Sequence, residues 1–250
     1  MFLSKLFKRE KIEEKADNQQ DIENEYLFVK PTDNIYGFQN KFYMQSNRLF
    51  KLFGNARSML PNRIKLLIIA DTHNALDEDE LISIINEHPN YNACLLLGDH
   101  SDNDIQKVLK YISKDKIYAL LGNHDFDYIS NYGLNNLNGQ ITYINGIRLL
   151  GIQGSFKYKP VSFPSFTQED SIRFLLDKEP VDILVSHDGP FDDEMINNPA
   201  HQGLFGITYY LFKNRVKYNI HGHLHEDFDK TLENGTIEKC LFGIRYIELE

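Results

Sequence analysis

The chain has 250 residues, 42% of them hydrophobic and 25% charged, as in globular proteins with a core of useful size. Its formal net charge is −9 and its pI is about 5.5, which argues against the basic surface of a nucleic-acid-binding protein. Cys94 and Cys240 form no CxxC pair, so we expect no disulfide framework and a cytoplasmic location. No apolar run approaches the ~18–20 residues that a transmembrane helix requires.

Residues 1–60 differ in composition from the rest of the chain. Residues 5–25 are mostly charged or amide side chains, and residues 26–53 are rich in Tyr and Phe. The first residues lack the long apolar centre and small-residue cleavage site of a signal peptide. We therefore expect an N-terminal extension over 1–60, either packed on the main domain or partly disordered, and a main domain over 61–250.

The stretch over residues 65–70, which is continuously apolar after Lys65, predicts a strand buried on both faces, and it ends in Asp71-Thr72-His73. Residues two apart in extended backbone project to the same side. A carboxylate and an imidazole should therefore converge at the carboxyl end of this strand, where open α/β sheets bind ligands. Taken alone, the pair is better explained as a helix cap and a polar loop residue.

The same pattern then recurs. A helix is predicted over 77–88, with acidic residues at its positive end. A buried strand over 91–97 runs into Gly98-Asp99-His100-Ser101-Asp102, and a helical stripe follows over 105–112. A third strand over 116–121 runs into Gly122-Asn123-His124-Asp125. Alternating elements of this kind predict a mixed or parallel sheet covered by helices.

The second half of the chain begins with a predicted hairpin over 141–150, with Asn145-Gly146 at its turn. Thr167 and Asp170 match a capping box that starts a helix. A strand over 181–185 leads to His187, a helix is predicted over 204–216, and a short strand over 218–220 leads to His221-Gly222-His223-Leu224-His225. A last hairpin is expected around Asn234-Gly235, ending in residues 245–249.

Five strand ends thus deliver candidate metal ligands. They are Asp71 and His73; Asp99; Asn123 and His124; His187; and His223 and His225. A single histidine is better explained as structural, but five equivalent placements are poorly explained by chance. Imidazole, carboxylate and amide oxygen together suit Mn, Fe, Zn, Co or Ni. Two such ions ~3.5–4 Å apart need a bridging carboxylate, and they can hold a nucleophilic hydroxide and clamp a phosphoryl oxygen.

In this order, the segments around these residues resemble the five-part signature of the calcineurin-like metallophosphoesterase superfamily. The matched motifs span residues 71–225. The resemblance implies an α/β fold that is a four-layer α/β/β/α sandwich of mixed sheets. It also implies an enzyme, a phosphoesterase that depends on two divalent metal ions, with manganese first and Fe, Zn, Ni or Co as alternatives.

The resemblance also assigns roles to residues. One ion would be held by Asp71, His73, Asp99 and His225, and the other by Asp99, Asn123, His187 and His223. His124 would be the catalytic histidine that stabilises the transition state or protonates the leaving oxygen, and Asp102 would orient it. Asn123 and His124 would face the substrate oxygens.

The implied reaction is hydrolysis of a phosphodiester or phosphomonoester by a hydroxide that bridges the two ions. The expected partner is a small phosphorylated substrate, for example a nucleotide-like one. Asn103 after Asp102 and Asp125 after His124 depart from the pattern of protein Ser/Thr phosphatases. Two alternatives stay open: a non-catalytic metal-bound scaffold that binds a partner protein, and a nuclease of the same fold, which the acidic charge disfavours.

Three further histidines are open to more than one interpretation. His221 is either a supporting residue behind the ligands or a polar strand residue. His100 follows a ligand and is expected to point away from the metals, because neighbours in extended backbone alternate. His201 lies in the loop before the last ligands, where it is a candidate for substrate contact.

Overall fold

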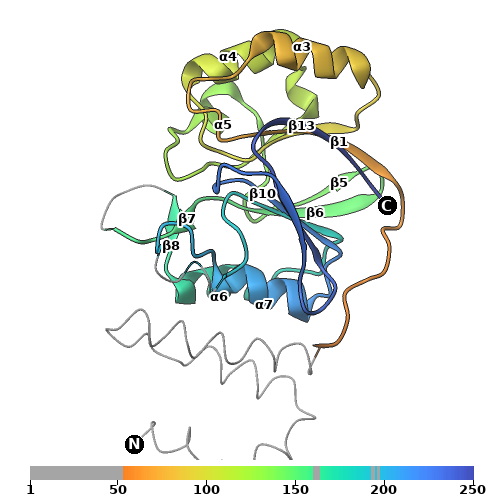
Figure 1. The fold of residues 1–250 in the computed structure, drawn as a ribbon, viewed down its shortest axis with the longest axis vertical. Helices are drawn as coiled ribbons and strands as arrows, with labels where there is room; N and C mark the ends of the chain where they lie inside the picture. Colours follow the sequence, from red (N-terminus) through yellow and green to blue (C-terminus); the bar gives the residue numbers. More distant parts are fainter. Residues whose placement is uncertain (1–52, 160–163, 193–194, 196–197) are drawn as a thin grey trace, which may run out of the picture.

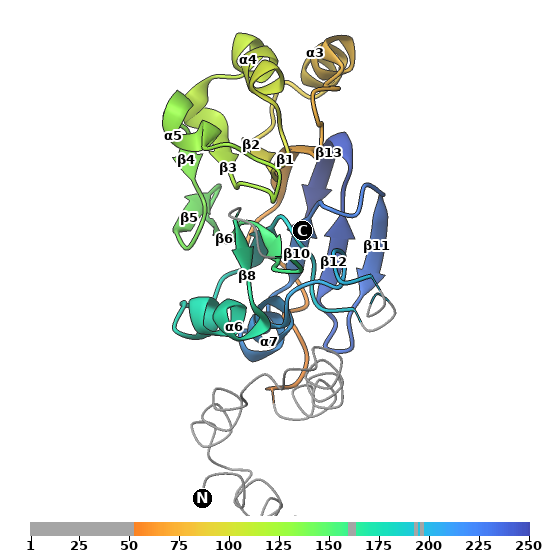
Figure 2. The ribbon, with the colours of Figure 1, turned by 90° about the vertical axis from the view of Figure 1, so that its left-hand side faces the viewer.

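The computed structural model describes residues 53–159, 164–192, 195 and 198–250. These residues form four layers, in the order helices, sheet, sheet, helices (Figure 1). Figure 2 shows the same layers turned by 90°, with α3, α4 and α5 on one outer side and α6 and α7 on the other. The predicted α/β/β/α sandwich is therefore confirmed.

The first sheet has the strand order β13-β1-β2-β3-β4. Its strands β1, β2, β3 and β4 are parallel, and β13 joins β1 in the antiparallel sense. The strands are β1 (Ile64–Ala70), β2 (Ala93–Leu96), β3 (Ile117–Ala119), β4 (Asn135–Asn136) and β13 (Gly243–Leu249). The helices between them are α3 (Glu78–Glu87), α4 (Asp102–Tyr111) and α5 (Tyr128–Tyr132), with a short 3₁₀ turn over Lys114–Lys116.

The second sheet has the order β11-β12-β10-β9-β6-β5 and is mixed. Strands β6, β9, β10 and β12 are parallel, and the outermost strands β5 and β11 are antiparallel to their neighbours. The strands are β5 (Ile141–Ile144), β6 (Ile147–Ile152), β9 (Ile183–Ser186), β10 (Tyr218–His221), β11 (Phe228–Thr231) and β12 (Ile237–Cys240). The helices are α6 (Gln168–Leu176) and α7 (Phe205–Lys213), and β7 (Ser155–Phe156) pairs with β8 (Ser165–Phe166).

The alternation along β1 explains why the layers hold together. Leu66 and Ile68 point into the core between the two sheets, whereas Leu67 and Ile69 point into the core under α3 and α4. All four side chains are fully buried. Successive residues of a strand project to opposite faces, so a continuous apolar run is what a strand covered on both sides requires.

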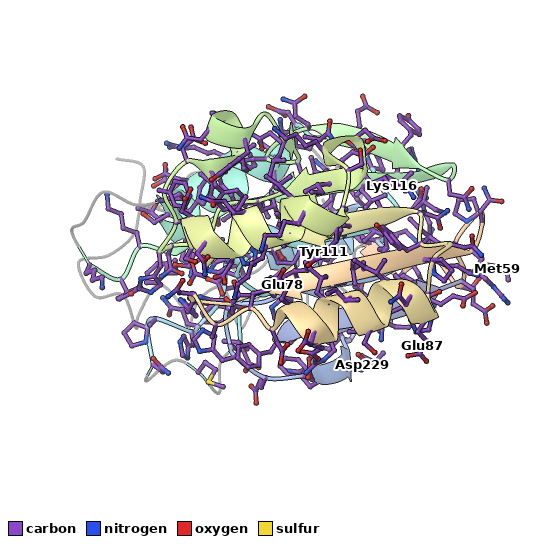
Figure 3. All side chains as sticks on the ribbon, turned by 90° about the horizontal axis from the view of Figure 1, so that it is seen from above. Met59, Glu78, Glu87, Tyr111, Lys116 and Asp229 are labelled. Atoms are coloured by element: carbon purple, nitrogen blue, oxygen red, sulfur yellow. The ribbon has the colours of Figure 1, made fainter. Side chains whose placement is uncertain are left out.

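Local signals placed several element ends correctly. Asp77 caps α3 by accepting from the amides of Asp79 and Glu80, and Thr167 caps α6 by accepting from Asp170. Asn145 and Gly146 both have positive φ, as a type I′ hairpin turn requires. The outer helices α3 and α4 are tied by the Tyr111 hydroxyl, which donates to Glu78 at 2.6 Å (Figure 3).

The prediction for the chain's end needs correction. A hairpin does form around Asn234-Gly235, but its strands are β11 and β12. Residues 245–249 belong to β13, which leaves the second sheet and pairs with β1 in the first. The first sheet therefore has an antiparallel edge strand that no local sequence pattern predicts.

The expected N-terminal extension falls mostly outside the described residues, which begin at Phe53. The residues that follow contact the main domain. Phe53 packs edge-on against Tyr209, and Arg57 forms an ion pair with the buried carboxylate of Asp182. Leu60 is buried in the core between the sheets. The boundary between 60 and 61 stays a prediction.

Candidate metal centre

The predicted ligands gather where strands of both sheets end. Asp71 and His73 follow β1, Asp99 follows β2, and Asn123 and His124 follow β3 of the first sheet. From the second sheet, His187 follows β9, and His223 and His225 follow β10. The site is thus built on the joint edge of the two central sheets.

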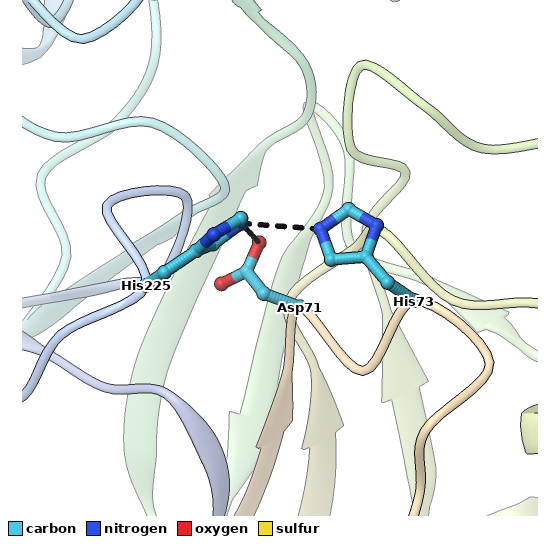
Figure 4. Close-up of side chains that lie close together, drawn as sticks. All are labelled: Asp71, His73 and His225. Atoms are coloured by element: carbon cyan, nitrogen blue, oxygen red, sulfur yellow. Dashed lines mark hydrogen bonds and ion pairs between the residues drawn. The ribbon is translucent and has the colours of Figure 1, made fainter.

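Asp71, His73 and His225 form the first group of donors (Figure 4). Their ligand atoms all lie within 4.8 Å of one another. The Nε2 atoms of His73 and His225 are 3.1 Å apart, and Asp71 Oδ1 is 4.0 Å from His225 Nε2. Asp71 is buried, whereas both imidazoles are substantially exposed. A cation held here would be accessible from solvent.

Asp99, His187 and His223 form the second group, and all three are buried. His187 Nε2 lies 3.0 Å from Asn123 Oδ1 and 3.8 Å from Asp99 Oδ2. His223 Nε2 is 2.7 Å from the carbonyl oxygen of Ala200, an acceptor, so this nitrogen carries the hydrogen and Nδ1 keeps its lone pair. Because Asn123 Oδ1 contacts His187 Nε2, Asn123 belongs to this second group as well.

Asp99 stands between the two groups. Its Oδ2 is 3.7 Å from His73 Nε2 in the first group and 3.8 Å from His187 Nε2 in the second. Its Oδ1 accepts a hydrogen bond from the His124 amide at 2.8 Å. One carboxylate that faces both groups has the arrangement that a shared ligand of two cations needs.

The backbone at the site is not extended, contrary to what the sequence predicted. The φ angles of Asp71, His73 and Asp99 are 52°, 44° and 59°, and those of His223 and His225 are 71° and 56°. These left-handed conformations are uncommon for residues other than glycine, and they cluster at functional sites. Asp71 and His73 do converge, but through a tight turn rather than along a strand.

Neighbouring loops hold these turns in place. The amides of Asp71 and His73 donate to the carbonyl oxygens of Gly98 and Asp99, at 3.0 and 3.1 Å. Glycine is required where the loops approach most closely, since a Cβ at Gly122 would lie 2.1 Å from Asp99 Oδ1. The loops after β1, β2 and β3 therefore form one interlocked surface.

The electrostatics of Asp71 fit an attached cation. Burial, followed by the nearby charge of Asp99, raises the pKa of Asp71 to about 8. Its Oδ2 accepts from the His223 amide, whereas its buried Oδ1 has no hydrogen-bond partner. A buried carboxylate oxygen without a donor is costly, and a metal ion satisfies it.

His187 gives the same indication independently. Burial lowers its pKa to about 3, so the ring is neutral. Its Nδ1 lies 2.8 Å from the carbonyl oxygen of Leu97 and therefore carries the single hydrogen. Nε2 then presents a lone pair toward the oxygens of Asn123 and Asp99. Lone pairs that converge on one another repel unless a cation lies between them.

Asp99 itself stays ionised. Burial raises its pKa, but the surrounding imidazoles, His187 first, and the hydrogen bond from the His124 amide outweigh that effect, and the pKa lies below its ordinary value. The two carboxylates near the centre thus differ in protonation when no cation is present: Asp71 holds its proton to about pH 8, and Asp99 does not.

Two carboxylates that were not predicted as site residues brace the loops. Asp104 is fully buried and accepts from the Thr72 hydroxyl and from the amides of Asn74 and Leu76. Asp125 accepts from the amides of Gly122, Asp99 and His100. The signal for Asp104 was present, because Ser101 and Asp104 form a capping box at the start of α4.

Asp102, predicted to orient His124, is not brought to it. Its carboxylate is exposed on the first turn of α4 and accepts from Gln106 and the Tyr132 hydroxyl. His124 is exposed, with its ring 5.8 Å from the ring of His73. The helix turns Asp102 outward, and we do not retain the role predicted for it.

The remaining histidines occupy distinct places. His100 points away from the donors, as expected: its Nδ1 bonds to Thr72 Oγ1 and its ring packs on Tyr128. His221 is fully buried, with Nε2 3.0 Å from Glu238 Oε1, directly behind the ligand loop. The ring of His201 packs edge-on against that of His223, at 5.1 Å.

The sequence from residue 64 to 227 matches the family model for the calcineurin-like phosphoesterases. The chain belongs to this family. Comparison with curated protein sequences gave no match. Among solved structures, the chain is similar to a phosphopantetheinyl hydrolase from Mycobacterium tuberculosis, with 10% identity and a TM-score of 0.55 over 74% of this chain and 96% of that one. It is also similar to the protein TT1561 of Thermus thermophilus, with 11% identity and a TM-score of 0.53 over 73% and 90%.

The similarity to these solved structures supports the fold, and membership of the family indicates the class of reaction. Calcineurin-like phosphoesterases are metal-dependent hydrolases of phosphoric esters, and the two donor groups of this chain lie within the matched residues. No helix in the described part of the chain has the length and apolarity to cross a membrane.

Proposed function

We propose that the protein hydrolyses a phosphodiester or phosphomonoester with two divalent cations held by the donor groups described above. One cation would be held by Asp71, His73, Asp99 and His225, and the other by Asp99, Asn123, His187 and His223. The observation that carries the proposal is the position of Asp99 Oδ2, 3.7 and 3.8 Å from one imidazole nitrogen of each group. Mn is our first choice of metal, with Fe, Zn, Ni or Co as alternatives that suit the same ligands.

When bound, such a pair of cations supplies Lewis-acid neutralisation of the phosphoryl oxygens and a water nucleophile that is reactive at neutral pH. The chain's own residues position the substrate. His124 is exposed beside the first group, where its ring nitrogens are available to a substrate oxygen. We assign it the transfer of a proton to the leaving oxygen, and Asn123 the binding of a phosphoryl oxygen.

We expect a small phosphorylated substrate, such as a nucleotide-like one, in a cytoplasmic setting in which Cys94 and Cys240 stay reduced. Both cysteines are free and buried, which agrees with that setting. The net charge of −9 disfavours a long nucleic-acid substrate. A non-catalytic scaffold needs no exposed histidine beside its metal ligands, so the position of His124 favours the enzyme.

The test is a turnover assay on the full chain, stripped with chelator and reloaded separately with Mn²⁺, Ni²⁺, Zn²⁺ or Mg²⁺. Bis-p-nitrophenyl phosphate and p-nitrophenyl phosphate report diesterase and monoesterase activity. We expect turnover with at least one metal and its loss in Asp99→Asn. Asp102→Asn, the same substitution at an exposed carboxylate outside the donor groups, should retain turnover. Metal binding without turnover of either ester would support the scaffold, and turnover of single-stranded DNA or RNA alone would support the nuclease.

A further inference from the structure

We propose that the ring of Phe242 forms one wall of a substrate subsite that binds a planar aromatic group next to the candidate metal centre. The inference rests on the proposed function and names its substrate class: a phosphate ester with an aryl or nucleobase ring close to the phosphorus. Phe242 lies between β12 and β13, outside the residues matched by the family model.

A continuous row of rings connects Phe242 to the centre. The ring centroids of His124 and His73 are 5.8 Å apart, and those of His73 and His225 are 5.0 Å apart. The Phe242 ring follows at 5.5 Å from His225, tilted by 32°. His124, which we assign to the leaving oxygen, and Phe242 are at opposite ends of this row. A phosphate bound to a cation at His73 and His225 would therefore direct its other substituent, the one that is not the leaving group, toward the Phe242 ring.

Phe242 is both exposed and held in place. Its relative exposure is 37%, enough to leave part of the ring open to a ligand. Its amide donates to Asp227 Oδ1 at 2.9 Å, and Arg245 donates to the same carboxylate's Oδ2 through Nε and Nη2 at 3.0 and 2.6 Å. Asp227 is two residues beyond His225, so one loop positions both the ligand and the ring. The backbone of Phe242 is thus anchored and its ring packs on His225, so the residue loses little freedom when a ligand arrives.

The other exposed large apolar side chains of the described residues do not have this relationship. They are Met59, Tyr111, Phe126 and Tyr143. Scattered exposed apolar residues are normal and need no function. Phe242 differs because its ring contacts an imidazole of the donor set. Aromatic rings stack on planar ligands at centroid distances of ~4.5–7 Å, and a ring of this kind accepts any base or aryl group.

The test uses two phosphonates, which the enzyme cannot hydrolyse, on the manganese-loaded full chain. Binding of phenylphosphonate and methylphosphonate is measured by calorimetry. The wild type should bind the phenyl compound more tightly than the methyl compound. Phe242→Ala should weaken phenylphosphonate binding about tenfold and leave methylphosphonate within about twofold. Phe242→Tyr, which keeps the ring, should retain the preference.

Tyr143→Ala is the matched control, since Tyr143 is an exposed aromatic residue on β5. It should change neither affinity. Equal affinity of the wild type for the two phosphonates, or an equal loss for both in Phe242→Ala, would overturn the inference. Turnover of bis-p-nitrophenyl phosphate, measured in parallel, keeps the two proposals apart. If the wild type turns over an ester but Phe242→Ala still prefers phenylphosphonate to methylphosphonate, only the role of Phe242 is contradicted. If neither nitrophenyl ester is turned over with any of the four metals, the proposed function is contradicted.

Discussion

The Nε2 atoms of His73 and His225 lie 3.1 Å apart, although 152 positions separate the two residues in the chain. His73 follows β1 of the first sheet and His225 follows β10 of the second, so this contact spans the sandwich. Two imidazole nitrogens at this distance need a proton or a cation to share. Since Asp71 and Asp99 flank them, a cation is the better match, and the predictions below depend on that interpretation.

Replacement of the shared carboxylate should remove more metal than replacement of a ligand that serves one group. We expect two equivalents of Mn per chain in the wild type, one in His225→Ala and fewer than one in Asp99→Asn, by elemental analysis after dialysis. Asp102→Asn is the control and should retain two. Equal metal contents in the Asp99 and His225 variants would show that Asp99 is not shared.

His124→Ala should lose turnover without losing metal. A positioned acid contributes about 10²–10⁴-fold to a rate, so we expect a decrease of kcat in that range with two Mn still bound. Asp102→Ala should stay within about twofold of the wild type, because its carboxylate is bonded to Gln106 and Tyr132 rather than to His124. A decrease in the Asp102 variant as large as that in the His124 variant would show that Asp102 does act on His124.

Metal affinity should rise with pH up to about 8. Burial, together with the charge of Asp99, raises the pKa of Asp71 to about 8, so below that pH a cation must displace its proton. The apparent affinity of the first group should rise about tenfold per pH unit from pH 6 and level off above pH 8, in titrations against a competing chelator. Asp71→Asn should bind more weakly and show a shallower dependence.

The same carboxyl should affect the stability of the metal-free protein. Its folded pKa is above the unfolded value of 3.8, so the folded state binds more protons between these two values. The contribution of Asp71 is therefore fully present at low pH and is lost as the pH rises toward 8. Denaturant unfolding at pH 5 and pH 8 should show a larger fall in stability for the wild type than for Asp71→Asn. Equal falls would contradict the raised pKa.

Asp104→Ala should destabilise the fold. The carboxylate is fully buried and receives hydrogen bonds from the Thr72 hydroxyl and three backbone amides, which the substitution leaves without an acceptor. We expect a loss of at least ~2 kcal/mol in the free energy of unfolding. Asp102→Ala, two residues away and exposed, should change it by less than about 0.5 kcal/mol. Similar losses for both would contradict the bracing role.

The sequence allowed the gathering of the candidate donors at one edge of the sheets to be predicted because each buried strand ends abruptly in polar residues. Asp71, Asp99 and Asn123 follow apolar runs with at most one or two residues between, and parallel strands bring such ends to one edge. The outward direction of Asp102 was not predicted, since it depends on where α4 begins and therefore on the rotation of its first turn. The capping box of Ser101 and Asp104 settles that rotation, whereas the apolar stripe over 105–112 does not reveal it.

Other features depend on contacts between distant segments. We expected β13 to form part of a hairpin. Instead, its seven residues pair with the seven residues of β1, although the two strands lie near opposite ends of the described sequence. The left-handed backbone at Asp71 and His73 arises from hydrogen bonds to the loop after β2, which a local pattern cannot reveal. The exposed ring of Phe242 beside His225 is likewise a product of that tertiary arrangement.

The central claim is that two cations bind side by side and share Asp99. The most direct test is anomalous diffraction from crystals of the full chain grown with Mn²⁺. We predict two peaks ~3.5–4 Å apart, one beside Asp71, His73 and His225 and the other beside Asn123, His187 and His223. A single peak, or peaks that leave Asp99 outside both coordination shells, would contradict the account.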